Sequence, residues 1–314
     1  MITQQQTLDT GFDATSTADD VLAHLDMHGR TIVVTGGYSG IGLAATNALL
    51  RAGAHVIVPA RRPAAASEAL RGTDAEVAEL DLGDLSSVAR FARDLVDSGR
   101  TLDALIASAG VMACPETRVG PGWESQFAIN HLGHFALGGN LHPAFSRDGA
   151  RVVTLSSAGH FLSGIRWDDI DFRSGYDRWL AYGQSKTATS LFAVQLDTNG
   201  RGEGLRAFTV HPGSILTRLQ RHIPRDQQIE RGWIDSEGRA AEGFKTVHQG
   251  AATMVWAATS PRLTGSGGLY LQDCNVAEPA EHDDMVTGGV KPWAIDVDEA
   301  TRLWELSTHR TNVT

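Results

Sequence analysis

The sequence contains few cysteines and no apolar run long enough to cross a membrane. Only two cysteines occur among its 314 residues, Cys114 and Cys274, and they lie far apart and in no metal-ligand pattern. This scarcity argues against a disulfide framework and against a metal site, so a reducing cytoplasm is the expected setting. The sequence has no stretch of about 18 apolar residues, which argues against a membrane span. The polar N-terminus also lacks the basic and apolar regions of a signal peptide.

Basic residues are also in short supply. The formal net charge is -10, whereas a surface that binds nucleic acid needs an excess of Lys and Arg to neutralise phosphates. We therefore expect no nucleic-acid partner, although the overall charge leaves room for a local basic pocket that binds one small anion. The hydrophobic fraction of 42% is typical of a soluble globular protein.

Short β-branched runs alternate with helix-length amphipathic segments along most of the chain. Segments long enough for crossover helices, such as Leu85–Val96 and Tyr182–Leu196, lie between these runs. Repeated units of this kind predict an α/β fold, a single doubly wound domain with a central parallel sheet of about seven strands flanked by helices. The candidate strands are Thr31–Thr35, His55–Pro59, Glu76–Leu80, Leu102–Ser108, Arg151–Ser156, Leu205–Val210 and Gly268–Leu271.

The pattern divides the chain into three parts. Residues 1–29 are expected to form a polar arm with a short helix that Thr17 can cap. Residues 30–271 carry the alternating pattern and form the expected domain. From residue 272 to 314 the periodicity lapses until a last helix at about Val297–Leu306, so we expect a C-terminal extension of the same domain.

The turn after the first candidate strand is rich in glycine. Gly36, Gly37, Gly40 and Gly42 lie in "TGGYSGIG", between a strand and a helix. Glycines at such a turn let backbone N–H groups approach a pyrophosphate at the helix N-terminus. A turn without a ligand is the alternative for an isolated motif, but the flanking strand and helix favour a nucleotide site.

Two arginines follow the second candidate strand. A ribose 2′-hydroxyl is commonly met by an acidic residue near this point, whereas a 2′-phosphate requires cations. The sequence has Arg61 and Arg62 here and no carboxylate, and guanidinium groups bind phosphate through paired hydrogen bonds. Ser39 is placed to add a hydroxyl donor. The alternative is a pair of solvated arginines, but their position favours NADP(H) over NAD(H).

A tyrosine, a lysine and a pair of serines form a candidate catalytic group. The segment "YGQSK" places Tyr182 and Lys186 four residues apart, on one face if it is helical. A phenol has a pKa of about 10, and a nearby ammonium favours its ionised form. Upstream, "VVTLSS" ends on Ser156 and Ser157, where a hydroxyl can hold a carbonyl or alcohol oxygen. Since the Tyr-Lys spacing also occurs by chance, a helical surface pair is the alternative.

These segments occur in the order and spacing typical of one enzyme family. "TGGYSGIG", "ELDL", "SAG", "NHLGHF", "VVTLSS", "YGQSK" and "HPGSILT" resemble the motifs of the short-chain dehydrogenase/reductases over about residues 30–271. "CPETRVGPGWESQFAINHLGHF" and "AYGQSKTATSLFAVQL" resemble the retinol-dehydrogenase-like branch. That branch includes the oxidoreductase domain of WW-domain-containing oxidoreductases, although this sequence has no WW domain. The resemblance implies a Rossmann-type domain.

The resemblance also implies a role for each site residue. Tyr182 would be the general acid and base, and Lys186 would lower its pKa and bind the nicotinamide ribose. Ser157, rather than Ser156, would orient the substrate oxygen, and Asn130 would position a water in a proton relay to Lys186. The implied cofactor-binding residues are Gly36, Tyr38, Ser39, Gly40, Ile41, Gly42, Arg61, Arg62, Asp81, Leu82, Ser108, Ala109, Gly110, Tyr182, Lys186, Pro212, Gly213 and Thr217. His131 and His134 are expected to be packing or surface residues.

One motif departs from the family. Where the family usually has "NNAG" after the fourth strand, this chain has Ala107, Ser108, Ala109 and Gly110. Both amides are lost, and Ser108 can replace only part of their hydrogen bonding. We expect activity to survive because the catalytic tetrad is intact, and the departure bears on the stability of the sheet or on cofactor affinity.

The expected function is an NADP(H)-dependent oxidoreductase that acts on a small hydrophobic carbonyl or alcohol. The substrate would be selected by two loops rich in apolar and aromatic residues, 158–181 and 218–244. The alternatives are an epimerase or dehydratase of the same family and a non-enzymatic, NADP-binding redox sensor with a protein partner. Family members often assemble through the helices that carry Asn130 and Tyr182, so a homodimer or homotetramer is a further expectation.

Overall fold

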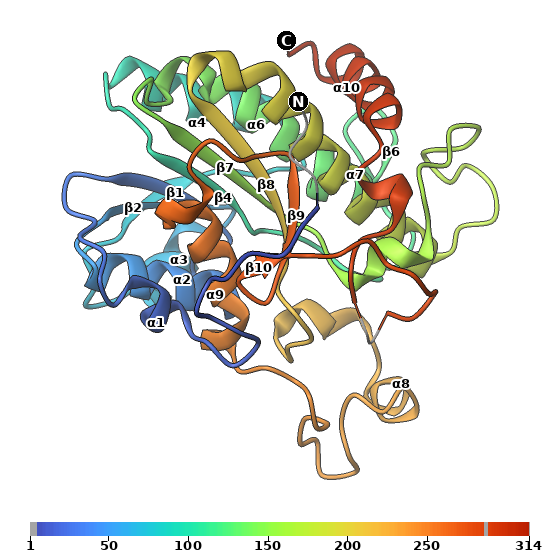
Figure 1. The fold of residues 1–314 in the computed structure, drawn as a ribbon. Coiled ribbons are helices and arrows are strands. Elements are labelled where there is room, and N and C mark those ends of the chain that lie inside the picture. Colours follow the sequence, from blue (N-terminus) through green and yellow to red (C-terminus); the bar gives the residue numbers. More distant parts are fainter. Residues whose placement is uncertain (1–4, 286–287, 314) are drawn as a thin grey trace.

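The computed structural model describes residues 5–285 and 288–313, which fold around one eight-stranded sheet (Figure 1). The strand order is β10-β9-β8-β7-β4-β1-β2-β3, and all neighbouring strands are parallel except β9 and β10. The seven expected parallel strands are therefore confirmed. The strands are β1 (Thr31–Thr35), β2 (His55–Ala60), β3 (Glu76–Glu79), β4 (Ala104–Ala107), β7 (Ala150–Leu155), β8 (Leu205–His211), β9 (Leu269–Gln272) and β10 (Asn275–Val276), with a separate hairpin of β5 (Arg118–Val119) and β6 (Trp123–Glu124).

The antiparallel strand β10 was not expected from the sequence. Its two residues are too few to carry a periodic signal, and it follows β9 through a two-residue turn. Asp273 and Cys274 in that turn both have positive φ, 52° and 54°, as the commonest two-residue hairpin turn requires.

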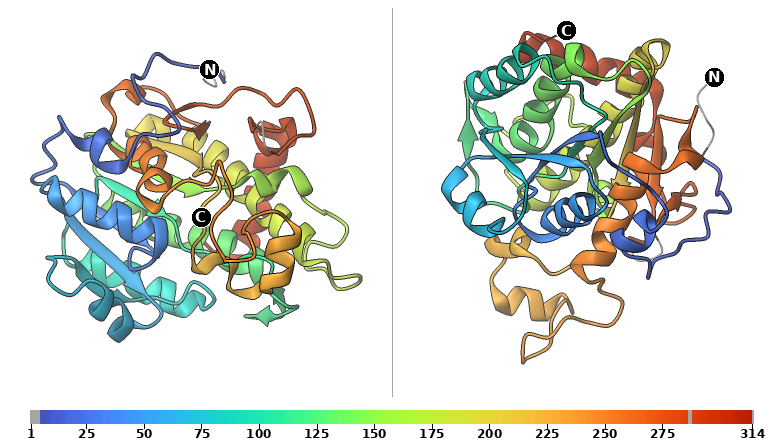
Figure 2. Two further views of the ribbon diagram at one scale, coloured as in Figure 1. Left: turned by 90° about the horizontal axis from the view of Figure 1, so that it is seen from below. Right: turned by 90° about the vertical axis from the view of Figure 1, so that its left-hand side faces the viewer.

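Helices cover both faces of the sheet, as the two further views in Figure 2 show. Successive residues of β1 point to opposite faces: Ile32 and Val34 pack beneath α2 and α9, whereas Val33 packs with side chains from α4, α6 and α7. This alternation is why the central strands read as continuous apolar runs. The helices are α1 (Ala18–Leu22), α2 (Gly40–Arg51), α3 (Pro63–Ala69), α4 (Leu85–Asp97), α5 (Ser125–Phe127), α6 (Gly133–Leu141), α7 (Arg178–Gly200), α8 (Arg225–Glu230), α9 (Val247–Thr259) and α10 (Val297–Thr311).

The last helix, α10, packs on the outer side of α7. Its Trp304 lies against Phe135 and Phe192, with ring centroids 4.8 Å and 6.1 Å away. The guanidinium of Arg310 forms two hydrogen bonds of 2.9 Å with the buried carboxylate of Asp171. The C-terminal extension is thus anchored to the helix that carries Tyr182 and Lys186.

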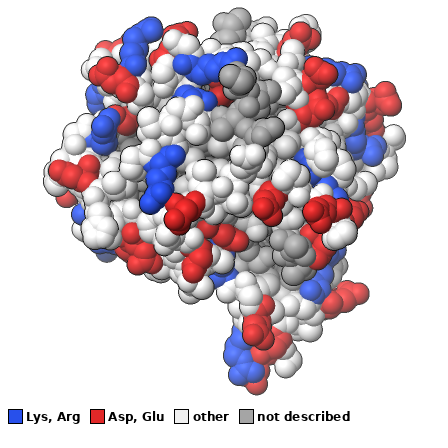
Figure 3. Space-filling model, viewed as in Figure 1, with Lys and Arg blue, Asp and Glu red and all other residues white. Residues whose placement is uncertain are grey.

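The segment that contains α8 projects from the body below the carboxyl ends of the strands (Figures 1 and 2). The face seen in Figure 3 has acidic and basic side chains interspersed, on the body and on this projection. Within residues 5–285 and 288–313, no helix combines the length and hydropathy that a membrane span requires.

The carboxyl ends of β1, β4, β7 and β8 meet at one edge of the sheet. The order of the strands reverses between β1 and β4, and in doubly wound sheets ligands bind at such a switch point. The glycine turn follows β1, Ser108 follows β4, Ser157 lies two residues beyond β7, and Pro212 follows β8. The fold therefore gathers the separate sequence motifs into one region.

Candidate active site

Two glycines at the turn between β1 and α2 leave no room for a side chain. Gly36 has a φ of +68°, and a Cβ there would lie 3.0 Å from the Cα of Ala109. A Cβ on Gly42 would lie 2.5 Å from the carbonyl oxygen of Gly36. Ser39 precedes α2 as its N-cap, but its hydroxyl makes no capping hydrogen bond. The N–H groups of the first helical turn therefore remain available for an anion, so this cradle fits a cofactor pyrophosphate.

Arg61 and Arg62 directly follow β2 and are exposed. Among the described residues, neither guanidinium has an ion-pair or hydrogen-bond partner, whereas nearby Arg71 pairs with Glu68. Two unpaired guanidinium groups next to the glycine turn fit a ribose 2′-phosphate. At the end of the neighbouring strand β3, the Asp81 side chain accepts a hydrogen bond from the N–H of Gly83 (2.9 Å).

The departure from "NNAG" is partly compensated by hydroxyl groups. The Ser108 hydroxyl donates to the carbonyl oxygen of Thr35, and the N–H of Ala109 donates to the Thr35 hydroxyl (3.0 Å). The Thr35 hydroxyl also lies 2.9 Å from Nε2 of His134. These bonds join the ends of β1 and β4.

Asn130 lies in a short π-helical segment, residues 128–132, between α5 and α6. Segments of this kind are frequent at functional sites. The Asn130 side chain accepts from the N–H of Val111 (2.9 Å) and donates to the Val111 carbonyl (3.0 Å) and to the Ser185 hydroxyl (2.9 Å). Its own carbonyl oxygen lies 3.0 Å from Nδ1 of His134. His134 is therefore a buried packing residue with two polar partners.

Tyr182 and Lys186 lie one turn apart on α7, and both are buried. Asp177 caps this helix by accepting hydrogen bonds from the N–H groups of Trp179 and Leu180, so α7 begins earlier than the expected Tyr182. The Lys186 ammonium lies 5.5 Å from the centre of the Tyr182 ring and donates to the carbonyl oxygen of Leu155 (2.7 Å).

The two serines after β7 face different ways. The Ser156 hydroxyl donates to the Lys186 carbonyl (3.0 Å) and accepts from the Ser190 hydroxyl (3.0 Å). Both of its hydrogen bonds are therefore made with α7. The Ser157 hydroxyl accepts from the N–H of Gly159 (3.1 Å) and lies near enough to the Tyr182 phenol to favour its ionised form. Ser157 is therefore the serine next to the phenol.

Burial dominates the ionisation of the pair. It raises the pKa of Tyr182 to about 12, and the hydrogen bond with Ser157 acts in the opposite direction. Burial also lowers the pKa of Lys186 to about 8, so the ammonium is still protonated at neutral pH. The expected lowering of the Tyr182 pKa is thus not a property of the protein without ligands. It requires positive charge closer to the phenol than the lysine alone supplies.

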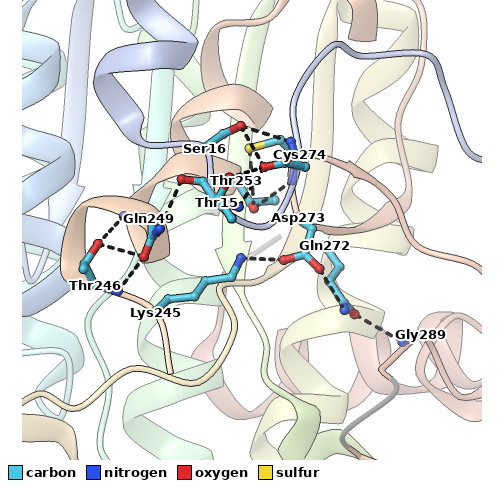
Figure 4. A network of polar contacts seen from close by, with 11 residues as sticks. Thr15, Ser16, Lys245, Thr246, Gln249, Thr253, Gln272, Asp273, Cys274 and Gly289 are labelled. Carbon is cyan, nitrogen blue, oxygen red and sulfur yellow. Dashed lines mark hydrogen bonds and ion pairs between the residues drawn. The ribbon is translucent and has the colours of Figure 1, made fainter. Parts of the chain in front are cut away.

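The loop after β8 meets the glycine turn. Gly213 has a φ of +93°, and a Cβ there would lie 2.8 Å from Cδ of Lys245. Thr217 lies close enough to Gly40 that a Cβ on that glycine would be 3.3 Å from its methyl group. Lys245 is in turn held by an ion pair with Asp273, within a network that also joins the N-terminal arm to the start of α9 (Figure 4).

The second loop, residues 218–244, places apolar side chains over Tyr182. Ile223 is buried in one cluster with Met112, Ala113 and Tyr182; Trp179, Leu219 and Trp233 pack against it. The Arg231 guanidinium lies 4.2 Å from the centre of the Trp179 ring and 5.8 Å from that of Trp233. It thereby fastens the loop to the first turn of α7.

Most aromatic residues of the first loop, 158–181, pack away from this cluster. Phe172 is fully buried beneath the guanidinium of Arg166, and Trp167 donates its indole N–H to Glu299 of α10. Only Trp179 reaches the apolar cluster. No role was expected from the sequence for Arg231, Trp233, His160 or Tyr270. The clearest sequence signal among them is the position of His160, three residues after Ser157.

Comparisons with known proteins show the family of this chain. The family model described as short chain dehydrogenase matches residues 30–228. A "Probable oxidoreductase" from Streptomyces lividans is 42% identical over 90% of this chain and 97% of its own length. Retinol dehydrogenase 14 from Mus musculus is 36% identical over 90% of this chain and 85% of its own length.

Solved structures show the same fold. An uncharacterized protein from Mycobacterium paratuberculosis has a TM-score of 0.73 and 33% identity, covering 93% of this chain and 97% of its own. A Pseudomonas aeruginosa RhlG/NADP active-site complex has a TM-score of 0.61 and 25% identity, covering 79% of this chain and 95% of its own. The chain belongs to the short-chain dehydrogenase/reductase family, in its retinol-dehydrogenase-like branch, and is an oxidoreductase.

Proposed function

We propose that the protein transfers a hydride between NADP(H) and a carbonyl or alcohol carbon of a lipophilic substrate, with Tyr182 as general acid and base. The observation that carries this proposal is the assembly of Ser157, Tyr182, Lys186 and Asn130 beside the glycine turn. When bound, the cofactor supplies the hydride or accepts it.

The chain's own residues move the proton and hold the oxygen. In reduction, Ser157 donates a hydrogen bond to the substrate carbonyl oxygen, and the Tyr182 phenol transfers its proton to the same oxygen. In oxidation, the phenolate removes the proton from the alcohol. Lys186 binds the ribose and stabilises the phenolate, and a water held at the Asn130 carbonyl returns protons to Lys186.

The cofactor preference follows from Arg61 and Arg62. Two exposed guanidinium groups without partners in the described structure offer paired hydrogen bonds to a 2′-phosphate. The NADP bound to the Pseudomonas relative supports the same preference. Gly36, Tyr38, Ser39, Gly40, Ile41, Gly42, Asp81, Leu82, Ser108, Ala109, Gly110, Pro212, Gly213 and Thr217 would form the rest of the cofactor site.

The substrate class follows from the cluster over Tyr182. Met112, Ile223 and the two tryptophans offer an apolar surface, which favours a hydrophobic ketone, aldehyde or alcohol. The name of the mouse relative, a retinol dehydrogenase, is consistent with such a substrate.

Titration with NADPH and NADH, followed by nicotinamide fluorescence, tests the cofactor site. We expect tight binding of NADPH and weak binding of NADH, and then turnover on a panel of hydrophobic ketones and aldehydes. Preference for NADH would contradict the role of the arginines. Binding of NADPH without turnover on any carbonyl or alcohol would favour the redox-sensor alternative.

Location in the cytoplasm and assembly into a homodimer or homotetramer remain predictions. Since α10 already covers part of α7, an assembly interface would have to include α10 or use another surface. Light scattering during size-exclusion chromatography measures the assembly directly.

A further inference from the structure

His160 is a fully buried imidazole at the start of the first loop, and its tautomer follows from its partners. Its Nε2 lies 3.1 Å from the backbone nitrogen of Lys291, an N–H group that can only donate, so Nε2 must accept. The proton is therefore on Nδ1, which donates to the carbonyl oxygen of Ser157 at 2.7 Å. Burial lowers the pKa of His160 to about 4, which keeps the ring neutral near pH 7.

The Ser157 carbonyl is held from three sides. Besides Nδ1 of His160, the His160 backbone N–H donates to it at 3.0 Å, and the Tyr270 hydroxyl lies 3.4 Å away. The same turn presents the Ser157 hydroxyl to Tyr182. It passes so close to the phenol that a Cβ on Gly159 would lie 2.7 Å from the Tyr182 ring. A small shift of this turn would move the hydroxyl relative to the phenol.

The C-terminal extension holds the other side of the imidazole. Lys291 supplies the N–H to Nε2, and the Trp293 indole donates to the His160 carbonyl at 3.1 Å. The Lys291 ammonium lies 4.9 Å from the centre of the Phe161 ring and pairs with Asp283. Residues 291–293 thus clamp His160 against the serine turn.

We propose that His160 is a positioning residue that couples the C-terminal extension to Ser157 through its two ring nitrogens. The inference rests on the proposed function and adds to it a role for the extension, which fixes where the substrate oxygen is held. Because the imidazole touches neither the phenol nor the substrate oxygen, its effect on turnover passes through the serine.

Two substitutions test the contributions of the two ring nitrogens separately. His160→Asn keeps a donor at the position of Nδ1 and loses the acceptor at Nε2, whereas His160→Gln keeps an acceptor near Nε2 and loses the donor. We expect His160→Gln to lower kcat about 10- to 100-fold, as small misplacements of reacting groups do, with NADPH affinity unchanged. His160→Asn keeps the bond to Ser157 and loses the one to Lys291, so its kcat should fall less, by about fivefold, the effect of one hydrogen bond. Equal kcat in His160→Gln and the wild type would overturn the proposal.

The link to the extension has its own matched pair of variants. Trp293→Phe removes the indole N–H that donates to the His160 carbonyl, and Trp167→Phe removes an indole N–H that donates to Glu299 instead. Both substitutions leave an aromatic ring in place. We expect kcat of Trp293→Phe to be lower than that of Trp167→Phe by about fivefold, the effect of one hydrogen bond. Equal values would overturn the coupling.

Crystal structures of these variants give a readout that does not depend on turnover. The Ser157 hydroxyl should keep its wild-type position beside the Tyr182 phenol in His160→Asn and move away in His160→Gln. An unmoved serine in His160→Gln would overturn the positioning role. A wild-type protein without turnover would instead overturn the proposed function, and the position of Ser157 in the variants would still decide the role of His160.

Discussion

The cofactor side of the site is made mostly of backbone, whereas the substrate side is made mostly of side chains. On the proposed cofactor side, Gly36 and Gly42 let main-chain atoms approach one another closely, and the N-terminus of α2 presents N–H groups that the Ser39 side chain does not cap. On the substrate side, the Ser157 turn depends on His160, which is held by Lys291 from 131 residues further along the chain.

This difference explains why the two sides are unequally visible in the sequence. A site built from backbone needs glycines at fixed spacing, so it leaves a motif that can be read without a structure. A site built from side chains of distant segments imposes no spacing. Residues such as Arg231 and Tyr270 meet their partners only because the sheet and the loops bring them together.

Replacement of Tyr182 should have the largest effect, because it removes the group that moves the proton. We expect Tyr182→Phe to lower kcat by about 10²- to 10⁴-fold, the usual contribution of general acid–base catalysis. NADPH affinity should be unchanged, because the ring and its packing remain. Steady-state kinetics and fluorescence titration measure the two quantities.

Tyr176→Phe is the matched control for this change. The Tyr176 hydroxyl donates to the Cys114 carbonyl (2.9 Å) in the same part of the molecule, and it makes no bond with Ser157 among the described residues. This variant should keep kcat near the wild-type value. A substantial residual rate in Tyr182→Phe would contradict the acid–base role.

On the proposed cofactor side, Arg61 and Arg62 would act through their side chains, whereas the glycine turn would act through its backbone. Replacing the two arginines therefore separates recognition by side chains from recognition by backbone. We expect the double Ala variant to bind NADPH about 10- to 30-fold more weakly, since hydrogen bonds to charged groups are among the stronger ones. NADH binding should not change, because the backbone cradle is intact.

A double Ala variant at Arg71 and Arg93 controls for net charge. Both residues are exposed, and they lie at the end of α3 and on α4. This variant should bind both cofactors as the wild type does. An equal loss of NADPH and NADH affinity in the Arg61 and Arg62 variant would mean that the pair does not recognise the 2′-phosphate.

Arg231 holds the loop 218–244 against α7. Its replacement should therefore weaken substrate binding and leave cofactor binding unchanged. Arg231→Ala removes the cation–π contacts with Trp179 and Trp233, and a contact of this type is worth about 1 kcal/mol. We expect KM for a hydrophobic substrate to rise by about fivefold, with little change in kcat or in NADPH affinity.

Arg239→Ala is a control within the same loop. Arg239 pairs with Asp235 and Glu237, residues of the loop itself, so its loss leaves the contact with α7 in place. A similar rise of KM in both variants would show that the loop responds to any charge loss and not to the loss of its attachment.

The sequence was sufficient for the fold, but it could not predict contacts between distant segments. The seven parallel strands were predicted because each is a short apolar run between turn residues. The second serine was preferred over the first only by resemblance, and the structure adds the reason: Ser156 is bonded to α7. The pKa of Tyr182 could not be predicted, because burial of the phenol depends on Met112 and Ile223 from separate segments.

Acid stability concerns folding and not turnover, and it tests the buried side chains directly. Burial lowers the pKa of His131 to about 3 and those of His134, His160 and His211 to about 4, below the unfolded value of 6.5. Between these values the unfolded chain binds more protons than the folded one, so stability falls as pH decreases through this range. Each histidine contributes up to about 1.4 kcal/mol per pH unit.

The melting temperature should therefore decrease between pH 7 and pH 5. His160→Asn removes one of the four titrating groups, so its melting temperature should depend less steeply on pH than that of the wild type, whatever its absolute value. His24→Asn is the control, because His24 is exposed and lies in the N-terminal arm. Equal slopes in His160→Asn and the wild type would mean that the imidazole of His160 is protonated in the folded protein. A protonated ring cannot accept at Nε2, so the hydrogen bond from the Lys291 N–H would be lost. The proposed link between the extension and Ser157 would then be contradicted.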